Sequence, residues 1–387
     1  MRPLCLALAL SLIAPAAFAE CGGSWSSFVA DLKSEAITKG HSKGSVDGFF
    51  SSARQDPKVL KADRAQGVFK RDFIDFSRRV ISQSRLNKGN ANAKKYASVF
   101  RRAEQEYGVP AGVLLAFWAL ETDYGAVQGE FNTLNSLMTL SHDCRRPELF
   151  RPQIFAALEL FERGNFDPRT TKGAWAGEIG MVQMLPEDII ANGVDGDGDG
   201  KVSLKTSAPD ALLSGAKMLN ALGWQAGQPW LQEVQVPAEM DWSKTGLDHN
   251  LSVNDWAAMG VKPRSGGFQG DAGAILLPMG RKGPAFIAYP NFRVYFEWNQ
   301  SFVYVTTAAY FATRLSGAPV YDPGNPDPSL SDSDMKSLQK KLAARGHDVG
   351  KIDGILGSGT RAAVQAEQQR LGFPADAWPT KSLLRKL

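Results

Sequence analysis

The stretch from Ala111 to Gly125, AGVLLAFWALETDYG, decides the fold, because it describes a helix that is apolar on every side until its last turn. Pro110, just before it, suits the first position of a helix, and Gly125 suits a helix end. A helix with apolar residues all round is buried inside a protein. The sequence therefore predicts a central buried helix whose first charged residue is Glu121.

Glu121 is the leading candidate for chemistry. A carboxylate at the buried end of a helix is costly, and both desolvation and the negative end of the helix dipole raise its pKa. A carboxylic acid that stays protonated near neutral pH can serve as a general acid. The alternative interpretation of this segment alone is a surface carboxylate just past the helix end.

Further segments of the chain resemble, in order, the motifs of lytic murein transglycosylases of the membrane-bound B type. These segments are Leu120–Gly125, the glycine-rich run Trp175–Pro186 (WAGEIGMVQMLP), an aspartate-rich loop described below, Pro290–Phe292, Asn299–Ser301 and Tyr304. The resemblance covers most of residues 25–315. It implies a mainly α protein with a lysozyme-like catalytic domain.

The resemblance also implies an activity on peptidoglycan glycan strands. The enzyme would cleave the β-1,4 bond between N-acetylmuramic acid and N-acetylglucosamine without net hydrolysis, leaving a 1,6-anhydro end. Glu121 would protonate the glycosidic oxygen and then, as a carboxylate, take the proton of the C6 hydroxyl. No cofactor is implied for catalysis.

Two other functions remain open from the sequence. A hydrolytic muramidase would use Glu121 with a second carboxylate, for which Glu178 is the candidate, and hydrolases place two such groups about 5–9 Å apart. A non-catalytic wall-binding protein would retain the fold without the reaction.

Six further residues are candidates for the cleft. Gln183 can donate to and accept from an N-acetyl or hydroxyl group, and Glu178 can orient Glu121 or the sugar. Tyr124 is either a core residue or part of the cleft wall. Trp298, Asn299 and Tyr304 would form the opposite wall, with Trp298 where the family often has a tyrosine. Asp123 is expected on another face of the helix, as a cap or surface group.

The aspartate-rich loop DGDGDGKVS begins at Asp195 and matches the start of an EF-hand calcium loop. Asp195, Asp197 and Asp199 occupy its first three ligand positions, and Lys201 would contribute a carbonyl. The usual closing glutamate is absent, and the resemblance implies Asp210 as its replacement. We expect a structural Ca²⁺; a solvated acidic turn is the alternative.

The N-terminus predicts export. Residues 1–19 have a charged start, an apolar centre and an Ala17–Ala19 cleavage site, which are the features of a secretory signal peptide. A periplasmic protein is expected. In that oxidising compartment Cys21 and Cys144 favour one disulfide, although two separate buried thiols remain the alternative.

The domain organisation follows from composition. Residues 20–315 show helical patterns with few strand signals and form the predicted catalytic domain, and residues 316–331 are a Pro-, Gly- and Asp-rich linker. Residues 332–387 resemble a small three-helix peptidoglycan-binding domain. The formal net charge of +4 gives no argument for nucleic acid, and no later apolar stretch approaches the ~20 residues of a membrane span.

Overall fold

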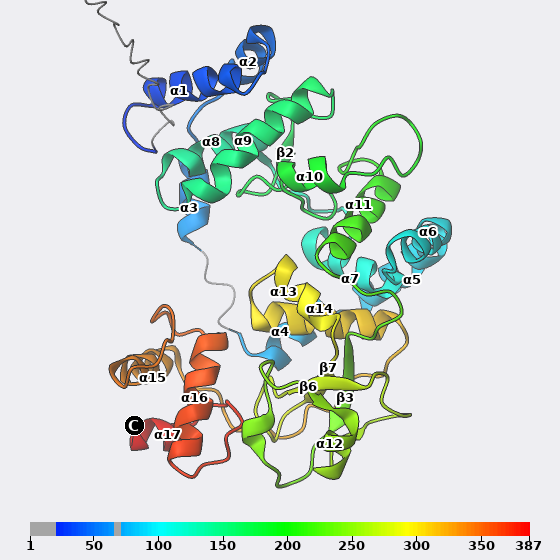
Figure 1. The fold of residues 1–387 in the computed structure, drawn as a ribbon, viewed down its shortest axis with the longest axis vertical. Coiled ribbons are helices and arrows are strands. Elements are labelled where there is room, and N and C mark those ends of the chain that lie inside the picture. Colours follow the sequence, from blue (N-terminus) through cyan, green and yellow to red (C-terminus); the bar gives the residue numbers. More distant parts are fainter. Residues whose placement is uncertain (1–20, 66–70) are drawn as a thin grey trace, which may run out of the picture.

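The computed structural model describes residues 21–65 and 71–387 (Figure 1). The predicted signal peptide, residues 1–19, lies outside the described residues. Helices dominate the described part, as the sequence predicts, and a small sheet lies in the lower half of Figure 1. None of the helices in this part is both long and apolar enough to cross a membrane.

An N-terminal helical unit packs the first three helices against helices that follow the central helix in sequence. Serine or aspartate caps open the first three helices: Ser24, Ser42 and Asp56 each accept a backbone N–H of the first turn. The unit consists of α1 (Trp25–Thr38), α2 (Lys43–Phe50), α3 (Pro57–Arg64), α8 (Thr133–His142), α9 (Pro147–Glu162) and α10 (Pro186–Asn192).

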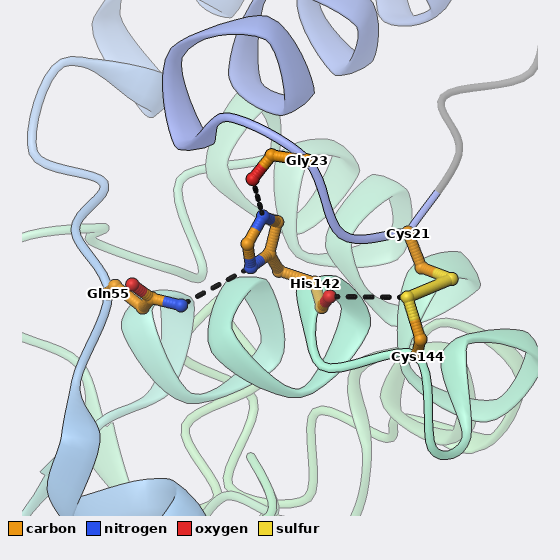
Figure 2. Close-up of a disulfide and its surroundings, with 5 residues drawn as sticks. All are labelled: Cys21, Gly23, Gln55, His142 and Cys144. Carbon is orange, nitrogen blue, oxygen red and sulfur yellow. Dashed lines mark hydrogen bonds between the residues drawn. A yellow bond between two sulfur atoms is a disulfide. The ribbon is translucent and has the colours of Figure 1, made fainter.

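A disulfide joins Cys21 to Cys144, as predicted (Figure 2). Next to it, His142 contacts the carbonyl of Gly23 through Nε2 at 3.2 Å and the side chain of Gln55 through Nδ1 at 3.2 Å. The segment before α1 is therefore attached to the end of α8 by a covalent bond and by hydrogen bonding.

The central helix α7 (Ala111–Thr122) is buried along its length from Gly112 to Ala119, which confirms the predicted burial on all sides. Pro110 is its N-cap rather than its first residue, and it ends at Thr122, earlier than Gly125 suggested. The end is fixed by Asp123, which takes the left-handed conformation with φ 50°. Aspartate tolerates this conformation better than most residues.

Other helices surround α7, and α14 packs along it most extensively. A Cβ atom at Gly112 would lie 2.9 Å from the carbonyl oxygen of Ala312, so the glycine permits this close approach. The surrounding helices are α4 (Phe73–Val80), α5 (Gln83–Lys95), α6 (Ala97–Tyr107), α11 (Ala208–Ala221), α13 (Phe292–Trp298) and α14 (Phe302–Leu315).

The expectation of few strands in residues 20–315 was wrong for one region. A five-stranded antiparallel sheet has the order β4-β6-β7-β3-β5. Its central strands are buried on both faces, one against the α7 and α14 core and the other against Trp256 and its neighbours. Strands covered on both faces lack the alternating pattern that reveals a strand in sequence.

The strands are short. They are β3 (Leu231–Gln235), β4 (Leu251–Ser252), β5 (Lys262–Pro263), β6 (Ala272–Leu276) and β7 (Ala285–Ala288); η2 (Trp242–Lys244) and α12 (Val253–Ala258) lie between them in sequence. A separate two-stranded ribbon pairs β1 (Phe131–Asn132) with β2 (Lys172–Gly173).

The C-terminal module has the predicted three helices, α15 (Asp332–Ala344), α16 (Ser358–Arg370) and α17 (Lys381–Lys386). It packs against the part of the chain that carries the sheet (Figure 1). Arg361 of α16 is buried, donates to the carbonyl of Pro278 at 2.8 Å and lies over the ring of Phe302 at 4.5 Å. Burial lowers the pKa of Arg361 to about 10.

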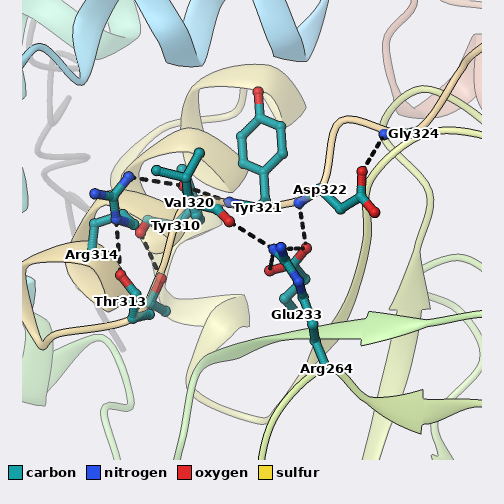
Figure 3. Close-up of polar contacts among 10 residues, drawn as sticks. Glu233, Arg264, Tyr310, Thr313, Arg314, Val320, Tyr321, Asp322 and Gly324 are labelled. Carbon is teal, nitrogen blue, oxygen red and sulfur yellow. Dashed lines mark hydrogen bonds and ion pairs between the residues drawn. The ribbon is translucent and has the colours of Figure 1, made fainter.

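The linker, residues 316–331, is extended but does not hang free as a tether. Tyr321 is buried among Phe73, Phe286 and Tyr310. Figure 3 shows its neighbours fixed as well: Arg264 donates to the carbonyl of Val320 at 2.7 Å, and the Asp322 N–H donates to Glu233 at 2.7 Å. Tyr321 is the buried aromatic anchor of this segment, and hydrogen bonds and the Lys282–Asp327 ion pair attach the rest of it.

Replacing Tyr321 with alanine is expected to lower the free energy of unfolding by about 3–5 kcal/mol, because it empties a large buried aromatic site. Urea denaturation would measure this change. The adjacent Val320→Ala is the control, since Val320 is 59% exposed and its loss should change the free energy of unfolding little. Equal effects of the two substitutions would contradict the anchoring of the linker by Tyr321.

Candidate active site

Glu121 lies one residue before the end of α7, where the apolar helix reaches a partly open surface. Burial raises the pKa of Glu121 above its ordinary value, and two hydrogen bonds to its carboxylate oppose that rise. The net direction is upward. The helix therefore provides the desolvated carboxyl group that the sequence predicts.

Two donors from the opposite wall fix the orientation of this carboxyl group. The Tyr304 hydroxyl donates to Glu121 Oε1 at 2.5 Å, and the Trp298 indole N–H donates to the same oxygen at 3.0 Å. Oε2 accepts no hydrogen bond from any described residue. Because Oε1 already receives two donors, Oε2 is the oxygen that can carry a transferable proton.

The wall itself is built from the end of α13 and the start of α14. The Trp298 ring packs on Phe117 of α7 with centroids 4.4 Å apart. Asn299 accepts the backbone N–H of Ser301 at 2.9 Å, and Ser301 caps α14. The sequence predicted Trp298 as part of this wall but did not reveal that its indole N–H donates to Glu121.

The glycine-rich turn forms the other side of the candidate site. A Cβ atom at Gly180 would lie 2.6 Å from the carbonyl oxygen of Leu204, and Gly180 has φ 82°, so only glycine fits there. Gln183 itself has φ 52° and donates to the carbonyls of Gly180 at 2.7 Å and Gln128 at 3.4 Å. Its Oε1 accepts no hydrogen bond within the described part of the chain.

Thr122 connects this turn to the end of α7. Its buried hydroxyl donates to the carbonyl of Met181 at 2.6 Å and accepts the N–H of Gly125 at 2.9 Å. The sequence analysis missed Thr122 and Gln128 as supporting residues. In the sequence they stand out only by being close to Glu121. That closeness does not reveal their hydrogen-bond partners Met181 and Gln183, which are more than fifty residues away.

Glu178 is a second carboxyl group with an altered pKa. Burial, with a smaller effect from the charge of Glu121, raises the pKa of Glu178 to about 7. Its Oε2 is buried and has no hydrogen-bond partner among the described residues. At or below neutral pH, Glu178 is therefore neutral in a large share of molecules.

Two of the candidates are engaged elsewhere. The Tyr124 hydroxyl donates to the carbonyl of Arg85 at 2.8 Å, and its ring packs edge-on against Trp118. Asp123, expected to be a cap or surface group, is the C-cap of α7 and pairs with Arg85 at 3.0 Å and Lys88 at 2.8 Å.

The aspartate-rich loop brings together Asp195, Asp197 and Asp210, with one oxygen of each within 4.8 Å of the others. Three hard oxygen donors in one cluster, one of them fully buried, fit a calcium ion. Asp199 is outside this cluster, and its carboxylate accepts the backbone N–H of Lys201 at 2.9 Å. Apart from this backbone N–H bond, Lys201 forms no hydrogen bond with the described residues.

Comparison with known families identifies the chain. A model described as Transglycosylase SLT domain matches residues 24–313, and one described as Putative peptidoglycan binding domain matches residues 331–387. The chain belongs to the SLT transglycosylase family, which confirms the family predicted from the motifs.

Relatives support this assignment. SltB3 from Pseudomonas aeruginosa, solved in complex with NAG-anhNAM-pentapeptide, is 36% identical, with a TM-score of 0.86 over 94% of this chain and 99% of that one. Membrane-bound lytic murein transglycosylase B of Escherichia coli (strain K12) is 28% identical over 231 residues, or 59% of this chain and 63% of that protein. Escherichia coli Slt35, solved in complex with calcium, shares the fold with a TM-score of 0.65 at 24% identity over 77% of this chain and 96% of that one.

Removing the Tyr304 hydroxyl is expected to move the alkaline limit of activity upward. Tyr304→Phe deletes a hydrogen bond that favours the ionised form of Glu121, so the pKa of Glu121 rises and its acid form persists to higher pH. A hydrogen bond to a charged group is worth ~1.5–3 kcal/mol, which corresponds to about 1–2 pH units. The pH dependence of peptidoglycan cleavage measures it.

Tyr295→Phe is the matched control. Tyr295 is buried on the same wall, and its hydroxyl has no partner within the described residues. An unchanged or lowered alkaline limit in Tyr304→Phe, or an equal shift in both variants, would contradict the proposed hydrogen bond to the acid.

Proposed function

We propose that this protein is a lytic transglycosylase in which Glu121 is the single acid and base. Glu121 protonates the glycosidic oxygen between N-acetylmuramic acid and N-acetylglucosamine, and the bond from muramic acid C1 to that oxygen breaks. The C6 hydroxyl of the same muramic acid then bonds to C1, and the Glu121 carboxylate accepts its proton. The products are a free 4-hydroxyl on N-acetylglucosamine and a 1,6-anhydro muramic acid end.

The observation that carries this proposal is the geometry of the Glu121 carboxyl group. Its raised pKa keeps a proton available, and the two donors on Oε1 leave Oε2 to exchange that proton with the substrate. When Glu121 loses the proton, the same donors stabilise the carboxylate until it accepts the proton of the C6 hydroxyl.

Glu178 is the candidate for the second carboxylate that hydrolysis would need. A hydrolytic muramidase needs an ionised second carboxylate as base or nucleophile. Burial raises the pKa of Glu178 to about 7, so near neutral pH it can act as a base when ionised or donate a hydrogen bond to the sugar when protonated. The product ends therefore distinguish the two reactions. The intact hydrogen-bond donors around Glu121 argue against a non-catalytic wall-binding protein.

The substrate contacts follow from the free polar atoms. Gln183 has an Oε1 without a partner among the described residues, and Trp298 has a partly exposed aromatic ring, so we assign both to contacts with the sugar. The Tyr124 hydroxyl is committed to the Arg85 carbonyl, so we assign Tyr124 to supporting the helix end. Asn299 uses its Oδ1 to support the wall, and its amide N–H groups have no partner among the described residues, so it stays a candidate for substrate contact. SltB3 was solved with peptide-bearing fragments, which suggests peptide-bearing murein as the substrate here.

We also propose export to the periplasm through the signal peptide at residues 1–19. Cleavage there would leave Cys21 near the start of the mature chain, and its disulfide with Cys144 fits an oxidising compartment. The proposed boundaries are 20–315 for the catalytic domain, 316–331 for the linker and 332–387 for the peptidoglycan-binding domain. The family matches at 24–313 and 331–387 support them.

Replacing Glu121 and Glu178 separately distinguishes the two reactions. Glu121→Gln should keep the fold and reduce cleavage by several orders of magnitude, whereas Glu178→Gln, a neutral isostere, should retain cleavage within about tenfold. Mass spectrometry of the muropeptides released by residues 20–387 should show anhydro ends in wild type and Glu178→Gln. Reducing ends in wild type, or loss of activity in both variants, would favour hydrolysis.

The aspartate cluster is expected to bind Ca²⁺ and stabilise the fold. Ca²⁺ that binds only the folded protein raises the melting temperature by mass action. Asp197→Ala, which removes an oxygen ligand, should abolish this increase, whereas Asp199→Ala should retain it, because Asp199 lies outside the cluster. Differential scanning calorimetry with and without a chelator measures both, and a wild-type melting temperature indifferent to Ca²⁺ would contradict the site.

A further inference from the structure

A polar pocket that includes none of the residues around Glu121 borders the β1–β2 ribbon at Asn132. It is a cavity of about 490 Å³ between the chain that follows α2, the start of α8 and the loop before β2. We call it the Arg54–Arg169 pocket; its lining residues include Ser52, Arg54, Asn132, Asn135 and Arg169. No acidic or large apolar side chain lines it.

The two guanidinium groups of this pocket have no ion-pair partner among the described residues. Other arginines nearby are paired; Arg145 and Arg146, for example, both bind the buried carboxylate of Asp63. The acid closest in sequence to Arg169 is Asp167, whose carboxylate accepts backbone N–H groups of Arg169 and Thr170. Both arginines are exposed, and the charge of Arg169 also contributes to lowering the pKa of Asp167. Neither arginine forms an ion pair with a described residue, so the two positive charges that line this polar cavity can bind an anionic ligand.

The backbone that carries each arginine is held by an asparagine at the start of α8. Asn135 is 7% exposed, and its Oδ1 accepts the N–H of Arg54 at 2.9 Å. Asn132 donates to the carbonyls of Pro168 at 3.0 Å and Arg169 at 3.2 Å. The pocket is therefore positioned by fixed hydrogen bonds rather than by two loops that approach by chance.

One further polar group in the pocket lacks a partner. The hydroxyl of Ser52 is buried and has no hydrogen bond to any described residue. A buried hydroxyl without a partner costs free energy unless a ligand or water satisfies it. Arginine pairs, a hydroxyl and asparagine amides are the groups that bind a carboxylate.

The pocket is within reach of the cleft. Asn132 is four residues from Gln128, whose carbonyl accepts the Gln183 amide at 3.4 Å, so at most about 14 Å of extended chain separates them. A stem peptide of five residues can extend to about 17 Å. A peptide attached to a sugar at Gln183 could therefore place a carboxylate in the pocket.

We propose that the Arg54–Arg169 pocket binds a carboxylate of the peptide carried by muramic acid. This inference rests on the proposed function for its substrate and adds a second point of recognition, separate from the sugar. The glycan backbone contacts the cleft, and the peptide's negative charge pairs with Arg54 and Arg169. Peptide-bearing murein is then bound more tightly than murein whose peptides have been removed.

Binding to an inactive protein tests this without relying on catalysis. Titration calorimetry would compare the disaccharide GlcNAc-MurNAc-pentapeptide with the same disaccharide lacking its peptide, both added to Glu121→Gln. We expect the peptide to tighten binding by about tenfold, as one charge-assisted contact near the surface does. The gain should fall as salt is raised.

The double substitution R54A/R169A in the same background should reduce the affinity ratio of the two ligands to about one. R54K/R169K keeps the positive charges but loses the planar guanidinium groups, so it should retain part of the preference for the peptide-bearing ligand. A retained preference would also show that substitution at these two positions leaves the pocket folded. Arg101→Ala is the control, because Arg101 is exposed, belongs to α6 and lies outside the pocket.

An unchanged ratio in R54A/R169A would overturn the proposal, and so would equal binding of the two ligands to the Glu121→Gln protein. Neither result would affect the proposed function, which depends on the chemical nature of the product ends. Conversely, products with free reducing ends would contradict the transglycosylase reaction but would not contradict peptide binding by the pocket.

Discussion

The burial of Glu121 at the end of α7 is the constraint on which the rest of the active site depends. A helix without a polar face provides the desolvation, and α14 packs along it. Desolvation alone would leave an acid of uncertain orientation. Trp298 and Tyr304 supply two donors to one oxygen, and the other oxygen has no hydrogen-bond partner among the described residues.

Parts of the chain far from Glu121 hold this arrangement in place. The disulfide and the His142 contacts attach the N-terminus to α8, and Thr122 connects the end of α7 to the glycine-rich turn. On the opposite side, the sheet packs against α14, and Arg361 of the C-terminal module lies over Phe302, the first residue of α14. The module that resembles a wall-binding domain therefore also supports the wall that carries Tyr304.

The sequence predicted what local pattern and residue chemistry determine. The apolar run of α7, the acid at its end, the disulfide and the three helices of the module were all predicted. The sheet was not predicted, because its strands are only two to five residues long and the central ones, covered on both faces, give no alternating pattern. The docking of the linker was also missed, since it depends on Tyr321 meeting aromatic rings that are distant in sequence. In the site, the indole donor of Trp298 and the committed hydroxyl of Tyr124 could only be recognised once their partners were placed.

The central claim is that the folded protein raises the pKa of Glu121. Carbon-13 NMR of protein labelled at the glutamate carboxyl carbon would measure it directly, with Glu121→Gln identifying the resonance. The account predicts a titration midpoint above the ordinary value of 4.5 for a glutamate. A midpoint at or below 4.5 would mean that Glu121 is ionised throughout the working range, and would contradict its assignment as the acid.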